Sequence, residues 1–111
     1  MSKKKLFQLN DIKSGESTGL TTEVNGTACM LLAVRMGYQI FVYINSCPHT
    51  GTPLDFHTGR FLSWDKKHIL CSTHGALFKI EDGQCIAGPC CNSYLEAVPV
   101  TIEDGNVFTV L

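Results

Sequence analysis

Cysteine and histidine residues are concentrated in one stretch of this chain. Residues 46–92 contain five of the six cysteines, all four histidines and three of the four prolines of the 111-residue sequence. The segments on either side are rich in β-branched and aromatic residues and contain only one cysteine. This division predicts that the flanking segments build the scaffold and that residues 46–92 carry the function.

The scaffold is predicted to be all-β. Runs of β-branched and aromatic residues alternate with turn residues, whereas a helical period is weak throughout, apart from one possible turn over residues 55–63. Asn25-Gly26 and Asp104-Gly105-Asn106 favour tight hairpins. We expect roughly eight to ten short strands that close into an antiparallel sandwich or barrel. The clearest runs are residues 5–9, 21–24, 27–35, 38–45, 68–71, 76–80, 95–103 and 107–111.

The length and charge of the chain bound its organisation and its partners. A chain of 111 residues has the usual length of one domain, so residues 1–111 are predicted to form a single domain. The net charge of −1 gives no strong attraction to nucleic acid or anionic lipid. The apolar stretch after the N-terminal lysines is only Leu6-Phe7, which is shorter than the roughly 7–15 residues of an export signal. No apolar run approaches the ~18 residues of a membrane span. We therefore expect a cytoplasmic protein that binds neither nucleic acid nor membrane, with cysteines in metal or redox chemistry rather than in disulfides.

Two short motifs each combine a thiol with an imidazole. The first is Cys47-Pro48-His49, and the second is Cys71-Ser72-Thr73-His74, with 21 residues between them. A tetrahedral zinc ion could take two sulfurs and two nitrogens, but familiar zinc motifs pair cysteine with cysteine and histidine with histidine. A binuclear iron cluster explains the alternation better, because each loop can give its thiolate to one iron and its imidazole to the other.

The second motif and the sequence after it resemble Rieske-type [2Fe–2S] proteins, in particular the small Rieske ferredoxins. Residues 71–78 are similar to the family's C-x-x-H-G-x-x-F segment, and residues 82–89 to its turn, strand and proline loop. The resemblance implies one cluster per chain, ligated by Cys47, His49, Cys71 and His74. It also implies that residues around the cluster include Thr50, Gly51, Thr73, Gly75, Ala76, Phe78, Gly88 and Pro89.

The same resemblance implies how the domain is organised. A small cluster-binding part, about residues 46–92, is expected to be inserted into a Rieske-type antiparallel sandwich made of residues 1–45 and 93–111. The 21-residue spacer between the two motifs is longer than is usual in the family. The extra residues lie around positions 56–67.

The implied function is electron transfer and not catalysis. A [2Fe–2S] cluster changes by one electron, and the family resemblance implies an NAD(P)H-dependent flavoprotein reductase upstream and a terminal oxygenase or other reductase downstream. Two alternatives stay open. The first alternative is the small Rieske subunit of a multi-subunit enzyme such as a nitrite reductase. The second, from another class of protein, is a structural zinc module.

Four positions predict a low reduction potential. High-potential members resemble C-x-H-x-G-C and C-x-C-H-G-S-x-Y, in which the extra cysteines form a disulfide and the hydroxyls donate to cluster sulfurs. In this chain Thr52 and Thr73 stand at the two cysteine positions, Ala76 at the serine position and Phe78 at the tyrosine position, as the resemblance implies. Without the two hydroxyl donors the reduced, more negative cluster is less stabilised, so the reduction potential is expected to be low.

The remaining cysteines and histidines are given structural roles. Cys29 lies in an apolar run and is expected to be a small buried hydrophobe. His57 and His68 fall outside the two motifs and are expected on the surface or in a strand. Cys85, Cys90 and Cys91 are expected to be reduced thiols packed near the proline loop, and the alternative is that Cys90 and Cys91 are redox-active or form a disulfide with Cys85.

Overall fold

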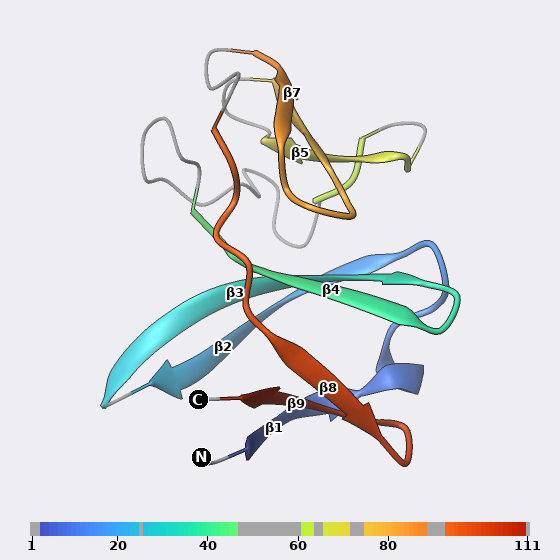
Figure 1. Ribbon diagram of the computed structural model, residues 1–111, viewed down its shortest axis with the longest axis vertical. Coiled ribbons are helices and arrows are strands. Elements are labelled where there is room, and N and C mark those ends of the chain that lie inside the picture. Colours follow the sequence, from blue (N-terminus) through green and yellow to red (C-terminus); the bar gives the residue numbers. More distant parts are fainter. Residues whose placement is uncertain are drawn as a thin grey trace.

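Three antiparallel sheets are stacked along the longest axis of the molecule (Figure 1). The computed structural model describes residues 3–24, 26–46, 61–63, 66–71, 75–88 and 93–110. The lower sheet has the order β1-β9-β8, the middle sheet β2-β3-β4 and the upper sheet β5-β6-β7. The elements are β1 (Lys3–Gln8), η1 (Leu9–Asp11), β2 (Ser17–Val24), β3 (Thr27–Met36), β4 (Gln39–Ile44), β5 (His68–Cys71), β6 (Ala76–Lys79), β7 (Cys85–Ala87), β8 (Val100–Glu103) and β9 (Asn106–Val110).

The predicted all-β architecture is confirmed, with four differences in detail. β2 begins at Ser17 and not at residue 21. Tyr38 lies in the turn between β3 and β4, where its side chain is 87% exposed, because Met36 pairs directly with Gln39. Residues 61–63 are extended and not helical, with Leu62 bridged to β5, and the rest of the predicted 55–63 turn lies outside the described residues.

Another difference concerns the predicted strand 95–103, which is a strand only from Val100. The residues before it bond to two different sheets. Ser93 accepts a hydrogen bond from the Cys85 amide in the upper sheet, whereas Glu96 accepts one from the Ile44 amide in the middle sheet. Because the partner changes within a few residues, this segment connects two sheets and cannot form one continuous ladder.

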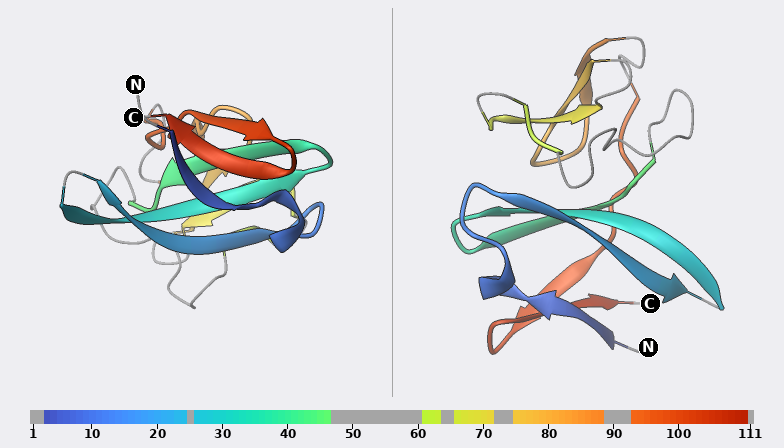
Figure 2. Two further views of the ribbon diagram at one scale, coloured as in Figure 1. Left: turned by 90° about the horizontal axis from the view of Figure 1, so that it is seen from below. Right: turned by 180° about the vertical axis from the view of Figure 1, so that it is seen from behind.

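The middle sheet is covered on both faces. Alternate residues of a strand point to opposite faces, and four successive residues of β3, from Leu31 to Val34, are all buried. Leu31 and Ala33 belong to a lower core shared with the lower sheet, and Leu32 and Val34 to an upper core shared with the upper sheet. The left view of Figure 2 shows the lower sheet lying across the middle sheet, with the two ends of the chain side by side because β1 pairs with β9.

The upper core joins the predicted cluster-binding part to the scaffold. Its buried members are Leu32, Val34, Tyr43, Phe61, Ile69, Cys71, Ala76, Phe78, Ile80, Cys85 and Leu95. Phe61 comes from the spacer between the two motifs, and its ring rests against Gly19 in β2, where an added Cβ would lie 3.1 Å from the ring. The longer spacer of this chain is therefore anchored to the scaffold through a fully buried aromatic side chain.

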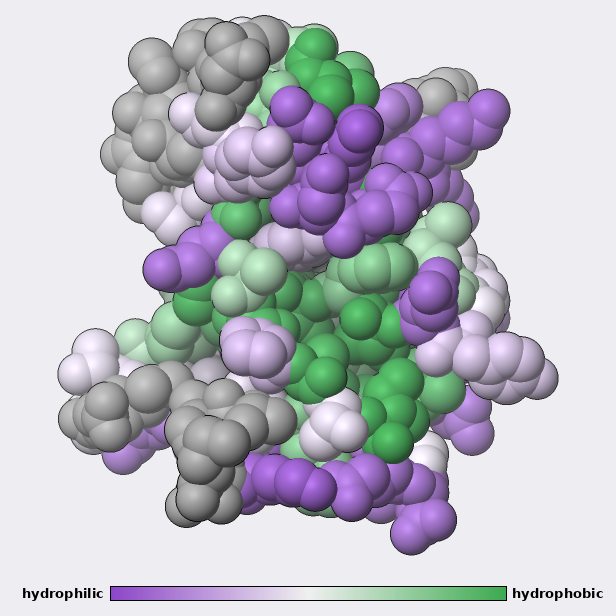
Figure 3. All heavy atoms as spheres, in the orientation of Figure 1, coloured by the Kyte–Doolittle hydropathy of each residue, from purple (hydrophilic) through white to green (hydrophobic). Residues whose placement is uncertain are grey.

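Residues 93–98 run down the outside of the molecule from the upper sheet to β8 (Figure 1). The Ile44 amide donates to Glu96, and the Val98 amide donates to Val42, so this connection covers the outer edge of β4. A covered edge cannot pair with another chain. Figure 3 shows that the surface over β4 and β8 on this side is mainly apolar, with strongly polar side chains above and below it.

Tyr43 of β4 reaches from the scaffold into the turn between β6 and β7. Its hydroxyl donates a hydrogen bond to the Ile80 carbonyl oxygen at 2.5 Å, and only 3% of the residue is exposed. Its ring packs against Gly83, where an added Cβ would lie 2.9 Å from Tyr43 Cε1. Burial, reinforced by the negative charges of Asp82 and Glu81, raises the pKa of Tyr43 from 10.0 to about 12.

The raised pKa of Tyr43 predicts a loss of stability at high pH. Below pH 10 the phenol is neutral in both the folded and unfolded states, and its full contribution is present. Between pH 10 and about 12 only the unfolded state ionises, so the free energy of unfolding falls as the pH rises. We expect the difference in unfolding free energy between wild type and Tyr43→Phe, measured with urea, to change over this window. A difference that stays constant from pH 9 to 12 would contradict the assigned environment.

Candidate metal centre

Of the four predicted ligands, the structure describes Cys71. The other three, Cys47, His49 and His74, lie outside the described residues, as do Thr50, Gly51, Thr73 and Pro89. Gly75, Ala76, Phe78 and Gly88 are described, so five of the predicted site residues can be placed. Among the described residues no group of three or more His, Cys, Asp or Glu side chains is positioned to hold a metal ion.

Cys71 is the last residue of β5 and is fully buried in the upper core. Its carbonyl oxygen accepts a hydrogen bond from the Gly75 amide at 2.8 Å, and its cross-strand partner is Ala76. The chain therefore reverses direction directly after the predicted ligand. Gly75 has a φ of +70°, which a residue with a side chain adopts only at a cost.

Ala76 and Phe78 lie on the same face of β6 and both are fully buried in the upper core. Ala76 is paired with Cys71, and Phe78 is paired with Cys85 across the β6–β7 ladder. Neither Ala76 nor Phe78 carries a side-chain hydroxyl, so the inward face of β6 offers no O–H donor at these two positions. This is the arrangement from which a low potential is predicted.

Gly88 directly follows β7 and lies against the start of β6. Its φ is +99°, and a Cβ at this position would lie 2.7 Å from the Cα of Ala76. The end of β7 therefore touches the backbone beside Cys71. The family resemblance places Gly88 and Ala76 near the cluster, but nothing in the sequence indicates that these two residues touch each other.

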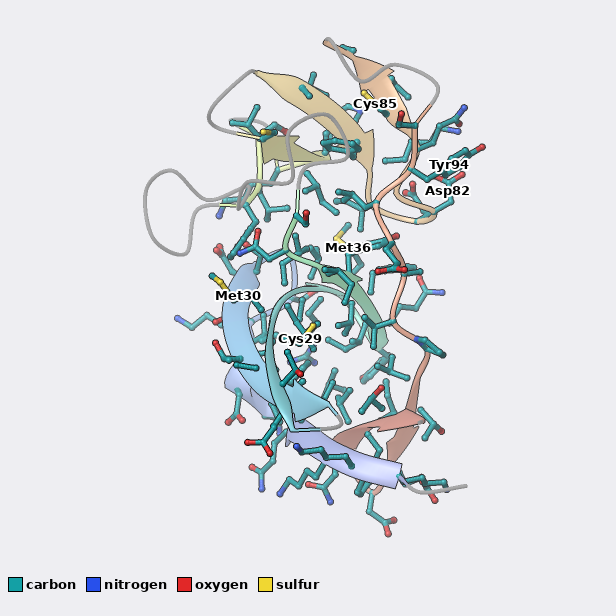
Figure 4. All side chains as sticks on the ribbon, turned by 90° about the vertical axis from the view of Figure 1, so that its left-hand side faces the viewer. Cys29, Met30, Met36, Asp82, Cys85 and Tyr94 are labelled. Atoms are coloured by element: carbon teal, nitrogen blue, oxygen red, sulfur yellow. The ribbon has the colours of Figure 1, made fainter. Side chains whose placement is uncertain are left out.

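The other described cysteines and His68 have the following environments. Cys85 is buried, and its Sγ donates to the Ala87 carbonyl oxygen at 3.3 Å. Cys29 lies on β3 in a different sheet from Cys85 (Figure 4), where it is half-buried against the lower core and not fully buried as expected. His68 is the first residue of β5, so its predicted place in a strand is confirmed. His57, Cys90 and Cys91 lie outside the described residues.

The β6–β7 turn carries two exposed acidic residues on the outside of the upper sheet. Glu81 and Asp82 are exposed, and Tyr94 lies beside Asp82 with 56% of its surface exposed (Figure 4). Tyr43 was not predicted as part of this region. The sequence places Tyr43 only within the strand predicted over residues 38–45, because the contact with Ile80 joins residues far apart in sequence.

Comparison with known families gives a match that extends over most of the chain. Residues 2–102 match the family model described as the Rieske [2Fe-2S] domain. The chain belongs to the Rieske [2Fe–2S] domain family. No curated protein matches its sequence.

Solved structures similar to this Rieske protein include several ferredoxins. The ferredoxin of Sphingomonas yanoikuyae B1 is 29% identical, with a TM-score of 0.75 and coverage of 99% of both chains. The ferredoxin of carbazole 1,9a-dioxygenase from Nocardioides aromaticivorans IC177 is 19% identical, with a TM-score of 0.74 and coverage of 99% of this chain and 98% of the other. The terminal oxygenase from the same organism matches 98% of this chain but 30% of its own length, with 19% identity and a TM-score of 0.78.

These comparisons confirm the predicted family and fold. The likeness to the Sphingomonas ferredoxin also agrees with the predicted class, an electron-transfer protein. The family implies a Rieske [2Fe–2S] cluster. The described part of the site fits such a group. Cys71 supplies a thiol at a strand end where its environment is apolar, and the backbone after it is closed by a hydrogen bond. Among the described residues, no helix is long and apolar enough to span a membrane.

Proposed function

We propose that this protein is a ferredoxin that holds one [2Fe–2S] cluster through Cys47, His49, Cys71 and His74. Its partners are an NAD(P)H-dependent flavoprotein reductase, which supplies electrons, and a terminal oxygenase or other reductase, which receives them. The observation that carries the proposal is the likeness to the Sphingomonas ferredoxin over 99% of both chains. When bound, the cluster supplies a site that gains and loses one electron.

The chain's own residues give this site its surroundings. The buried side chains of Ala76 and Phe78 keep the region beside Cys71 apolar, and the bond from Gly75 to the Cys71 carbonyl holds the strand end in place. Water exclusion and fixed backbone geometry both tune a metal group through its surroundings. In this proposal residues 46–92 form the cluster-binding part, and residues 1–45 and 93–111 form the scaffold.

Within this proposal a terminal oxygenase is the favoured electron acceptor. One similar structure, 24% identical, is described as a complex of reduced oxygenase and oxidized ferredoxin in carbazole 1,9a-dioxygenase, and it covers 96% of this chain. The alternative, a Rieske subunit built permanently into a larger enzyme such as a nitrite reductase, predicts a different behaviour. Such a subunit stays with its large partner during purification, whereas a ferredoxin separates from it and exchanges between partners. We further propose a cytoplasmic protein that binds neither nucleic acid nor membrane.

The test measures metal, spectrum and electron flow on the purified full chain. We expect two irons and two acid-labile sulfides per chain, and a paramagnetic signal of low average g in the reduced form, as imidazole ligation gives. Reduction by NAD(P)H should require a flavoprotein reductase, and reoxidation should be accelerated by a terminal oxygenase. One zinc per chain and no visible absorbance would contradict the proposal and favour the zinc module. A cluster that no reductase can reduce would leave the cofactor but refute the carrier role.

A further inference from the structure

Gly88 lies closer to its neighbour than any side chain would allow. A Cβ at position 88 would be 2.7 Å from Ala76 Cα, 3.0 Å from Ala76 Cβ and 3.2 Å from Ala76 N. Two of these three atoms are backbone and the third is the alanine Cβ, so no side-chain rotation at Ala76 can make room. The φ of Gly88, +99°, also lies where residues with side chains are strained.

The backbone touched by Gly88 is the backbone that holds Cys71. Ala76 is the cross-strand partner of Cys71, and the preceding amide, that of Gly75, donates to the Cys71 carbonyl oxygen at 2.8 Å. A methyl group at position 88 therefore presses on the strand end that carries the proposed ligand. Close-packed interiors transmit such displacements instead of absorbing them.

The other side of the contact is also fixed. Ala87, the residue before Gly88, is paired with Leu77, the residue after Ala76. The β6–β7 ladder is irregular next to this pair, because Phe78 is paired with Cys85, which leaves Ile86 as an extra residue on β7. With β7 held to β6 on one side of the contact and Cys71 held to Ala76 on the other, extra volume cannot be accommodated without moving one of them.

We propose that Gly88 is a positioning residue for Cys71. The missing side chain at position 88 sets how closely the end of β7 approaches the reversal between Cys71 and Ala76, and this fixes the Cys71 sulfur for cluster binding. Gly88 acts through Ala76 and does not itself bind the cluster. The inference rests on the proposed function, because Cys71 matters only if it is a ligand.

Three glycine-to-alanine variants separate this role from ordinary strain. Gly88→Ala adds both the steric contact and the positive-φ strain. Gly37→Ala, at a φ of +64° with nothing within 4 Å of its added Cβ, adds the strain alone. Gly83→Ala, at a φ of +76°, adds strain and a core clash with the Tyr43 ring at 2.9 Å, at the other end of β6 from Cys71. Each holoprotein is measured for melting temperature, reduction potential and iron release to a chelator.

We expect all three variants to melt below wild type. Only Gly88→Ala should change the reduction potential, and it should hold iron roughly tenfold or more weakly, as do variants of residues that support metal ligands. A wild-type potential and wild-type iron retention in Gly88→Ala would overturn the proposal. Equal changes in Gly83→Ala would overturn it as well, because they would show a general effect of core disruption.

A further variant, Ala76→Gly, tests the same contact if Gly88→Ala yields no folded protein. Ala76→Gly removes the methyl group from the same contact without adding volume, and we expect weaker iron retention and a changed potential. Wild-type values for Ala76→Gly would then refute the role of this contact. A wild-type protein without iron and sulfide would instead refute the proposed function, so the two failures are distinguishable.

Discussion

Replacing Cys71 by alanine is expected to abolish cluster binding. The variant loses the proposed thiolate ligand at position 71, and the alanine that takes its place in the apolar upper core has no atom that can bind iron. Loss of one thiolate leaves one iron a ligand short. Ligand bonds supply much of the folding energy in small metal-binding domains. Purified Cys71→Ala should therefore be colourless, with no iron or acid-labile sulfide, and should melt below wild type.

Two other cysteines provide matched controls for Cys71→Ala. Cys85 is buried in the same upper core, so Cys85→Ala tests the loss of a buried thiol without the loss of a proposed ligand. Cys29 is half-buried against the lower core. We expect both variants to retain two irons and two sulfides, with Cys85→Ala destabilised by roughly 1–3 kcal/mol. A cluster retained in Cys71→Ala, or lost in Cys85→Ala, would contradict the assigned ligand.

The sequence predicted most of the scaffold because local signals and tertiary structure agree there. Thr27–Met36 and Asn106–Val110 are strands of β-branched and apolar residues next to short turns. In the turn between β8 and β9, Asp104 and Gly105 both have positive φ, as the Asp-Gly sequence predicts for a primed hairpin turn. Such features depend on residues within a few positions of one another, which a single sequence displays directly.

The predictions that differed from the structure depended on tertiary pairing. Residues 95–99 carry apolar residues typical of a strand, yet their hydrogen bonds go first to the upper and then to the middle sheet. The Tyr43–Ile80 hydrogen bond and the Ala76–Gly88 contact likewise join different elements. No local pattern encodes either contact, because a tyrosine in a buried strand and a glycine after a strand each have many structural uses.

The candidate site is predicted from residue type and spacing. Two thiol–imidazole pairs indicate a [2Fe–2S] centre because this cluster needs two kinds of ligand on two irons. The placement of Cys71 at a buried strand end agrees with that interpretation. The family resemblance implies which residues surround Cys71, but not how they contact one another. The contacts among Gly75, Ala76, Gly88 and Cys71 depend on how β5, β6 and β7 pair in the sheet.

Restoring two hydroxyl groups beside the cluster should raise the reduction potential. Ala76 and Phe78 occupy the positions of the serine and tyrosine of high-potential family members, as the resemblance implies. We therefore expect the wild-type potential in the lower part of the Rieske range of about −150 to +300 mV. Both residues are fully buried on the inward face of β6. A hydroxyl placed there is away from bulk water, so its interaction with a change in cluster charge is weakly screened.

The expected size of the effect follows from the difference between redox states. A hydrogen bond to a charged group contributes roughly 1.5–3 kcal/mol, and only the part gained on reduction raises the potential. If about half of that is gained, the shift is tens of millivolts up to about a hundred, since 59 mV corresponds to a factor of ten for one electron. Ala76→Ser/Phe78→Tyr should therefore have a higher potential than wild type in protein-film voltammetry, and each single variant an intermediate value.

A tyrosine elsewhere in the same core separates hydrogen bonding from a general change in polarity. Phe41 packs against the upper core from β4, so Phe41→Tyr adds the same hydroxyl on a different element. We expect its potential to stay at the wild-type value. Stability gives a second readout, because a buried hydroxyl without an acceptor costs about 1–3 kcal/mol. Phe78→Tyr should therefore destabilise the cluster-free protein more than the holoprotein, in which a cluster sulfur would accept the hydrogen bond. An unchanged potential in the double variant, or an equal rise in Phe41→Tyr, would show that positions 76 and 78 do not set the potential of this Rieske protein.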